Sequence, residues 1–306
     1  GPVPSYFTDA TDASGIRFRH VSSDWISRFR RYGPLAPTFS GGGVTAGDVD
    51  GDTWPDLIYC GGEGCAAFGN MRDGTFEDIT ESTGLNVPGE ARMSIAADFS
   101  NDGDDDVFIT YARDTNRLFA NRGDGGFDDV TGDSGLQRDG DISGPVTAFD
   151  YDNDGLLDIY VGNFGDYLNG ASPWIAPDAQ NALPNRLYRN LGDLRFEDVS
   201  EAAGTGNTGW TQALSHIDYD RDGDEDIYVA NDFGSNELLK NRGDGTFVPV
   251  AQELGADDPL DGMNVAFTDF NRDAHADILI SNIWGWFPGD RGPREYNTLL
   301  VSTIDA

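Results

Sequence analysis

Short apolar segments alternate along the chain with clusters of Gly and Asp. Within residues 144–204 the segments "PVTAF", "LDIYVG", "RLYRN" and "RFEDVS" are rich in β-branched and aromatic residues, and turn-forming residues bound each of them. Similar successions occur at residues 43–85, 91–136, 210–255 and 262–303, with a period of about 50 residues. The pattern predicts repeated units of short strands.

A period of this length with four strands per unit is typical of the blades of a β-propeller. Isolated hairpins are not stable, whereas blades packed face to face around an axis bury both sides of each sheet. We therefore expect an all-β fold, a β-propeller of five four-stranded blades, which forms a single domain over residues 1–306. The third blade carries an insertion at 165–184.

The two ends of the chain complement each other. The fifth unit has three strand-like segments, "MNVAFTDF", "ADILISN" and "NTLLVST", and no fourth. The segment "FTDATDASGI" at Phe7–Ile16 resembles "FEDITESTGL", which ends the first unit. We expect residues 6–16 to supply the outer strand of the fifth blade and to close the ring, which removes two exposed sheet edges. The alternative is a longer propeller interrupted at Ala306.

An acidic loop follows the first strand of every unit: "DVDGDTWPD", "DFSNDGDDD", "DYDNDGLLD", "DYDRDGDED" and "DFNRDAHAD". Side-chain oxygens fall at loop positions 1, 3, 5 and 9, and the backbone carbonyl at position 7 is available. Such alternation directs oxygens at one hard cation, and calcium accepts six to eight of them. The predicted ligands are Asp48, Asp50, Asp52, Asp56, Asp98, Ser100, Asp102, Asp106, Asp150, Asp152, Asp154, Asp158, Asp218, Asp220, Asp222, Asp226, Asp269, Asn271, Asp273 and Asp277.

The other interpretation of these loops is that Asp-Gly turns are good turns with solvated charge. Aspartate occupies 18 of the 20 ligand positions, and its self-repulsion would oppose folding without cations. We therefore expect up to five Ca²⁺, one per blade, with the weakest site in the loop that contains Asn271.

The composition limits the partners. A net charge of −34 repels nucleic acid and anionic membranes, so we expect neither as a partner. A content of 38% hydrophobic residues favours a packed protein over a disordered one, and no run of 18 apolar residues predicts membrane insertion. The oligomeric state does not follow from these features.

The loop motif "DxDxDGxxD", followed by "N-x-L-x-x-N-x-G-D-G-x-F", resembles FG-GAP/VCBS-type repeats such as those of integrin α-subunit propellers. The phrases "GIRFRH", "GGGVTAGDVDGD" and "FEDVSEAAG" further resemble the cartilage acidic protein/UnbV-associated branch. The resemblance covers essentially the whole chain. It implies a calcium-binding propeller outside the cytoplasm, often one that serves adhesion or ligand recognition.

Cys60 and Cys65 flank "GGEG" between two expected strands. A hairpin with a four-residue loop brings its flanking residues close enough for a disulfide, and two free buried thiols are the alternative. A disulfide and calcium sites both suit an extracellular or periplasmic protein, so we expect secretion.

Up-and-down strand order places all the acidic loops on one face and three unusual segments on the other, among them the loop formed by residues 17–42. Arginine suits capture of anionic groups, and tryptophan suits stacking on sugars or apolar side chains. We expect this second face to bind a protein, peptide or glycan ligand, anionic or neutral, through Arg17, Arg19, Arg28, Arg30, Arg31, Trp174, Trp284 and Trp286.

Catalysis has less support in the sequence. The alternative to a binding module is a hydrolase or lyase that acts on a polysaccharide or peptide at the mouth of the central channel. Its candidate catalytic residues are His20 and His216, and a polar cluster joining both with Gln212 and an arginine would favour it. For His216 the competing interpretation is a hydrogen-bonded strand residue.

Overall fold

The computed structural model describes residues 7–20, 42–166, 169–171, 179–259, 261–283 and 297–303. Its strands form five antiparallel sheets, of which the first four have four strands and the fifth has three. The first two sheets are β1 (Val44–Gly47), β2 (Asp56–Gly61), β3 (Gly64–Asn70) and β4 (Phe76–Asp78), then β5 (Ala91–Ala97), β6 (Asp106–Tyr111), β7 (Arg117–Asn121) and β8 (Phe127–Asp129). The others are β9 (Ser143–Phe149), β10 (Asp158–Asn163), β11 (Arg186–Asn190) and β12 (Phe196–Asp198), then β13 (Thr211–Ile217), β14 (Asp226–Asn231), β15 (Glu237–Asn241) and β16 (Phe247–Pro249), and finally β17 (Asp261–Thr268), β18 (Asp277–Ile283) and β19 (Thr298–Leu300).

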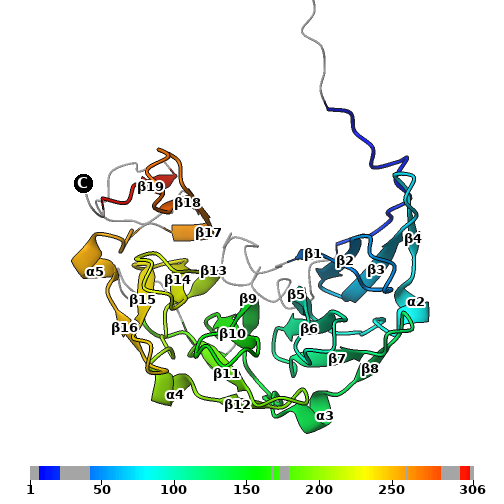
Figure 1. The fold of residues 1–306 in the computed structure, drawn as a ribbon, viewed down its shortest axis with the longest axis horizontal. Helices are drawn as coiled ribbons and strands as arrows, with labels where there is room; N and C mark the ends of the chain where they lie inside the picture. Colours follow the sequence, from blue (N-terminus) through cyan, green and yellow to red (C-terminus); the bar gives the residue numbers. More distant parts are fainter. Residues whose placement is uncertain are drawn as a thin grey trace, which may run out of the picture.

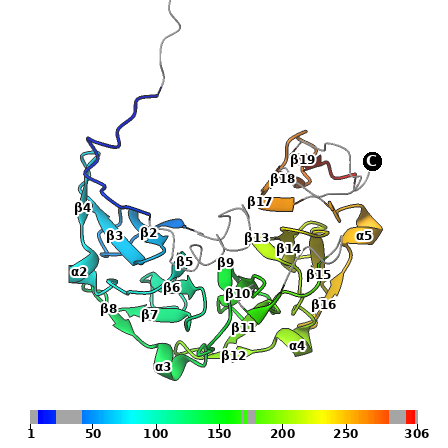
Figure 2. The ribbon, with the colours of Figure 1, turned by 180° about the vertical axis from the view of Figure 1, so that it is seen from behind.

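The sheets follow one another around an arc, with β1, β5, β9, β13 and β17 innermost (Figures 1 and 2). The first strands of neighbouring sheets contact one another from β1 to β17. One-turn helices lie at the rim: α2 (Thr80–Thr83), α3 (Thr131–Ser134), α4 (Ser200–Ala203) and α5 (Ala251–Leu254). The prediction of an all-β propeller built of five blades is confirmed.

The second strand of each blade provides most of the core. Every residue of β6, β10 and β14 is buried, because these strands lie between the neighbouring blades on both sides. One apolar cluster joins Ile58 of β2 to Val107 and Ile109 of β6, and comparable clusters join the following pairs of blades. The strands therefore read as nearly continuous apolar runs, and their packing fixes the loops at their ends.

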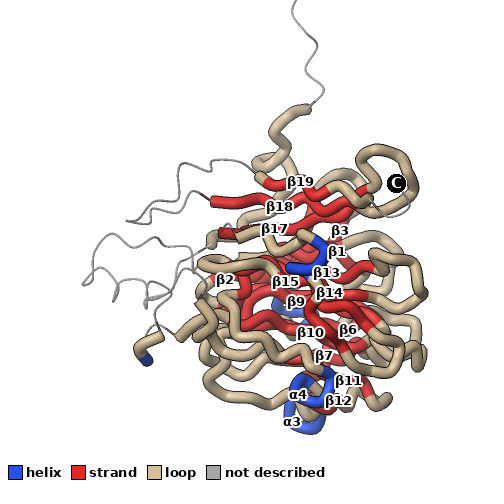
Figure 3. The backbone as a smooth tube through the Cα atoms, turned by 90° about the vertical axis from the view of Figure 1, so that its left-hand side faces the viewer, coloured by secondary structure: helices blue, strands red, loops and turns tan. Residues whose placement is uncertain are grey.

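Seen from the side, the strands run from one face of the arc of sheets to the other, and the loops that join them gather at these two faces (Figure 3). The acidic loops of neighbouring blades touch on one of these faces. Asn101 Nδ2 donates to the carbonyl of Gly155 at 2.9 Å, and Asn153 Nδ2 donates to Asp224 Oδ1 at 2.7 Å. The acidic loops are thus neighbours on one surface.

The N-terminal segment differs from the expectation that residues 6–16 form the outer strand of the fifth blade. Described residues 7–16 form no strand, and the fifth sheet contains only β17, β18 and β19. Instead, the N–H of Phe76 at the start of β4 donates to the carbonyl of Ser14 at 2.7 Å. The segment therefore lies against the first blade, and pairing with β19 is absent among the described residues.

A repeated glycine contact explains this position. Gly135 has φ of 82°, and a Cβ there would lie 2.2 Å from the carbonyl oxygen of Phe196, the first residue of the next blade's outer strand. Gly15 has φ of 83° and meets Phe76 in the same way, at 2.6 Å. Residues 7–16 thus occupy the place of the rim turn of a preceding blade. The sequence likeness to "FEDITESTGL" therefore corresponds to a turn that docks on the next blade, and residues 7–16 form no outer strand.

Candidate metal centres

The five acidic loops share one backbone conformation. In the third loop, Asp150 at position 1 accepts the N–H groups of Asp154 and Gly155 at 3.0 and 2.8 Å, and Asp154 in turn accepts the N–H of Leu156. The first loop has the same bonds from Asp52 and Thr53 to Asp48. Carboxylate-to-backbone bonds therefore shape each loop before any cation is considered.

Glycine at position 6 is not required for this shape. Three loops have Gly there, but Thr53 and Ala274 occupy the same position with φ of 71° and 73°. Positive φ is strained for a β-branched residue such as Thr. The two side-chain oxygens of Asp48 that accept the N–H groups of Asp52 and Thr53 hold the strained residue in place.

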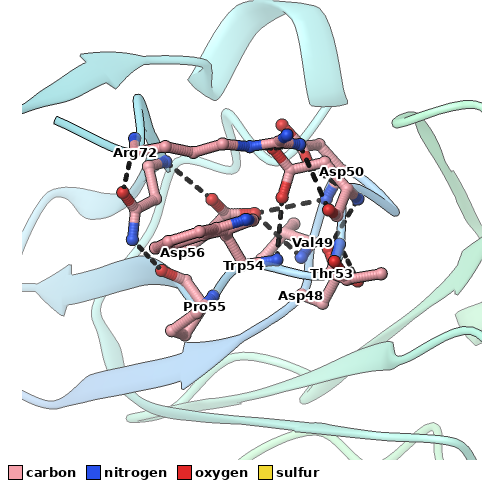
Figure 4. Close-up of polar contacts among 10 residues, drawn as sticks. Asp48, Val49, Asp50, Thr53, Trp54, Pro55, Asp56 and Arg72 are labelled. Carbon is pink, nitrogen blue, oxygen red and sulfur yellow. Dashed lines mark hydrogen bonds and ion pairs between the residues drawn. The ribbon is translucent and has the colours of Figure 1, made fainter.

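Three loops bring carboxylates from positions 1, 3 and 9 together. In each, one ligand atom per residue lies within 4.8 Å of the other two. These clusters are Asp48, Asp50 and Asp56, then Asp150, Asp152 and Asp158, then Asp218, Asp220 and Asp226. Figure 4 shows the first cluster, with Arg72 reaching across the loop. The other two loops have Ser100 and Asn271 at position 3, so they hold one carboxylate fewer at the four ligand positions.

The aspartate at position 9 is the most buried member of each loop. Asp158 has no exposed surface, and it accepts the N–H of Tyr151 at 2.9 Å and the N–H of Asn190 in β11 at 2.7 Å. Burial raises the pKa of Asp158 and Asp226 to about 7 and that of Asp106 to about 6. These carboxylates join the loop to the third strand, and ionising them without a nearby cation is unfavourable.

The donor set fits a hard divalent cation. It consists of oxygen atoms, and Asp152 Oδ1 and Asp220 Oδ1 are buried without a hydrogen-bond partner. Unpaired buried carboxylate oxygens are costly, and a bound cation would satisfy them. The residues at positions 1, 3, 5 and 9 therefore suit the calcium that the sequence predicts.

Sequence reasoning missed the role of the two asparagines in "N-x-L-x-x-N". The second one, Asn190, donates through Nδ2 to the carbonyls of Leu157 and of Phe99 in the preceding blade, at 3.0 and 2.9 Å. The first one, Asn185, accepts the N–H of Asn163 through Oδ1 at 2.7 Å. The pair therefore fixes both ends of the second strand. The repeated motif itself was the signal that could have revealed this.

The raised pKa values predict that the metal-free protein loses stability as the pH rises from about 4 to about 7. Between these values the folded state retains protons on Asp158 and Asp226 that the unfolded chain releases, so proton release on raising the pH favours unfolding. Thermal melting in chelator across this range measures the effect. Calcium should abolish the trend, and a metal-free protein that becomes steadily more stable up to pH 7 would contradict it.

The candidate ligand residues fall into two groups. Arg28, Arg30, Arg31, Trp174, Trp284 and Trp286 lie outside the described residues. Arg17 is exposed and donates to the carbonyls of Thr11, Asp12 and Ile16, and Arg19 is exposed. Arg17 thus supports the N-terminal turn.

The two histidines named as catalytic candidates have different surroundings. His20 lies beside Gly42 and Gly61, at the end of β2 opposite the acidic loop. His216 Nδ1 lies 2.7 Å from Thr147 Oγ1 of the preceding blade, and its ring stacks on Phe149 with centroids 4.9 Å apart. Burial lowers the pKa of His216. These contacts match those of a hydrogen-bonded strand residue that joins two blades.

Cys60 and Cys65 form a disulfide across the β2–β3 hairpin, as predicted, with Cα atoms 4.1 Å apart. In the described part of the chain, no helix combines the length and the apolar character needed to cross a membrane.

Known proteins share parts of this sequence. The chain is 35% identical to cartilage acidic protein 1 of Homo sapiens over 139 residues. This matched stretch covers 45% of this chain and 20% of the relative. It is 29% identical to cartilage acidic protein 1 of Xenopus tropicalis over 209 residues, and this stretch covers 63% of this chain and 31% of the relative. The chain thus spans less than a third of the length of these relatives.

Among solved structures, a lectin of Agrocybe aegerita, described in terms of its recognition of non-reducing terminal N-acetylglucosamine, superposes with a TM-score of 0.46. The two share 18% sequence identity over 78% of this chain and 60% of that chain. The V. cholerae biofilm matrix protein Bap1 superposes with a TM-score of 0.43 at 15% identity, over 79% of this chain and 35% of that chain.

Four segments, residues 48–109, 98–161, 174–229 and 218–280, match the family described as the FG-GAP-like repeat. Three of them begin at the first aspartate of an acidic loop, at Asp48, Asp98 and Asp218, and all four end in the second strand of the following blade, in agreement with the repeat seen in the fold. Since the matched segments together cover well over half of the 306 residues, the chain belongs to the FG-GAP-like repeat family.

Proposed function

We propose that this chain is a secreted, calcium-stabilised propeller that recognises a protein, peptide or glycan ligand. The observation that carries the calcium part of the proposal is the recurrence of one loop conformation in all five blades, with three clusters of carboxylates around buried aspartates. Structural turns alone do not need buried carboxylates, which are unfavourable without a counter-charge.

Each cation would be held by side chains at loop positions 1, 3, 5 and 9 and by the carbonyl at position 7. When bound, it supplies positive charge that favours the ionised form of the buried aspartate. In the third blade these residues are Asp150, Asp152, Asp154 and Asp158. Because Asp158 also accepts the N–H of Asn190, metal binding at the loop supports the third strand of the blade.

Secretion and recognition rest on separate features. The Cys60–Cys65 disulfide favours an oxidising compartment, and the relatives are named for cartilage. Placing the ligand face opposite the acidic loops follows from up-and-down strand order and from the arginines and tryptophans assigned there. A chain of net charge −34 orients an anionic partner toward its few arginine-rich segments.

Replacing Trp284 and Trp286 together with Ala is expected to weaken ligand binding at least about tenfold, because tryptophan is among the residue types that dominate binding energy at recognition surfaces. The measurement is binding to arrays of sulfated and neutral glycans and of extracellular matrix proteins, followed by titration of any ligand found. Exposed Trp54, which lies within the first acidic loop, provides the comparison on the opposite face. A ligand that loses affinity with Trp54→Ala but not with the double variant would place recognition on the other face.

A further inference from the structure

Three of the acidic loops hold a basic side chain from their own blade. Arg189 of β11 contacts Asp152 at 2.8 Å and Asp154 at 3.3 Å. Lys240, at the equivalent position of β15, contacts Asp220 and lies 3.1 Å from Asp222. In each case the contacted carboxylates stand at loop positions 3 and 5. The basic group therefore lies among the residues assigned to the cation.

The first loop also holds a basic side chain, which comes from a different position and pairs with loop position 5 alone. Its third strand has Gly69 at the position of Arg189 and Lys240, and the basic residue comes three positions later. Arg72 lies 2.7 Å from Asp52 at loop position 5, and its guanidinium lies 5.9 Å from the centroid of the Trp54 ring (Figure 4). Lys240 Nζ similarly lies 5.9 Å from the ring centroid of Tyr219. Aromatic and carboxylate neighbours thus hold these basic groups over the loops.

The two remaining loops have no such partner among the described residues. The equivalent positions are Ala120 in β7 and Val301 just after β19, and no described Lys or Arg makes an ion pair with the aspartates of these loops. Arg221 acts on Asp273 only at longer range. These are also the loops in which Ser100 or Asn271 replaces the carboxylate at position 3.

Basic partners therefore occur in the loops where all four ligand positions carry carboxylates, here called the four-carboxylate loops, and not where only three of them do. With every ligand carboxylate counted as ionised, as it would be around a bound cation, the four ligand positions and the paired basic group sum to three negative charges in each of the five loops. An isolated exposed ion pair contributes little to stability, so stability alone does not explain why the pairs follow the fourth carboxylate. Electrostatic competition between the basic group and a bound cation explains why the two occur together.

We infer that Arg189, Lys240 and Arg72 are built-in counter-cations that weaken metal binding at the four-carboxylate loops and hold these loops together when no metal is bound. The inference rests on the proposed calcium function. It assigns the control of metal affinity to residues in or just after the third strand, which lie outside the ligand motif. A single positive charge about 5 Å from a divalent ion in a water-exposed site opposes binding about tenfold.

The test is the double variant Arg189→Met/Lys240→Met, which keeps the aliphatic stems and removes both charges. Calorimetric titration of the chelated protein with Ca²⁺ should show two of the sites binding about tenfold more tightly than in the unmodified chain. The same variant should melt at a lower temperature in chelator, because the carboxylates at positions 3 and 5 of two loops then lack their basic partner. The matched control is Arg138→Met, which removes an arginine that pairs with Asp198 on an outer strand.

The reciprocal variant Ala120→Lys adds a basic group to the second loop and should weaken one site about tenfold. It gives an independent answer if the double variant does not fold. Calcium affinities that are unchanged relative to Arg138→Met, in the double variant or in Ala120→Lys, would overturn the inference while leaving the calcium sites in place. An unmodified chain that binds no calcium would instead overturn the proposed function on which the inference rests.

Discussion

Removal of calcium is expected to lower the melting temperature of this protein by roughly 15–30 °C. A ligand at about 100 times its Kd contributes about 2.7 kcal/mol per site, so three occupied sites contribute about 8 kcal/mol. For a domain of this size each kcal/mol shifts the midpoint by about 2–4 °C. The three carboxylate clusters make three a conservative number of sites.

The measurement compares thermal unfolding in chelator with unfolding in about 1 mM Ca²⁺, a concentration suited to extracellular sites. Magnesium at the same concentration serves as the control, since it gives up its waters reluctantly and should restore little of the loss. Equal midpoints in chelator and in calcium would contradict the expectation. Equal rescue by magnesium would show screening of charge and not specific binding.

Among single substitutions, we expect Asp158→Ala to have the largest effect. The change leaves the buried N–H groups of Tyr151 and Asn190 without an acceptor, at a cost of about 1–3 kcal/mol each. Removing a carboxylate whose burial is itself unfavourable offsets part of this loss. We therefore expect a decrease of about 3 kcal/mol in the free energy of unfolding in chelator, and a larger one in calcium.

Urea unfolding with and without calcium measures this effect, and Asp154→Ala is the matched control in the same loop. Asp154 stands at position 5, where it accepts the N–H of Leu156 near the surface. Its loss should remove one metal site but change the metal-free stability by less than about 1 kcal/mol. If the two variants are equally stable in chelator, then Asp158 does not join the loop to β11 as described.

The repeat made most of the fold predictable. Strand positions followed from apolar segments at a fixed spacing, and the Cys60–Cys65 disulfide followed from a short hairpin loop. Loop shape was also accessible, because Asp at positions 1 and 5 bonds to backbone only two to five residues away. Interactions within one loop are local, so the order of residue types largely determines them.

Interactions between segments distant in sequence were not predictable. Arg189 meets Asp152 across 37 positions, and Asn190 meets Phe99 of another blade across 91. Both contacts depend on strand register and on the packing of blades, which periodicity does not specify. The N-terminal segment shows the same limit, because its likeness to a rim turn did not indicate whether it would pair with β19 or dock on Phe76.

The central claim is that the five loops bind calcium, and the most direct measurement is the number of calcium ions bound per chain. Native mass spectrometry of protein equilibrated with calcium, with chelated protein as the reference, counts the ions on each folded molecule. The account predicts at least three, for the loops with four carboxylates, and at most five. A folded chain that carries no calcium under these conditions would contradict it.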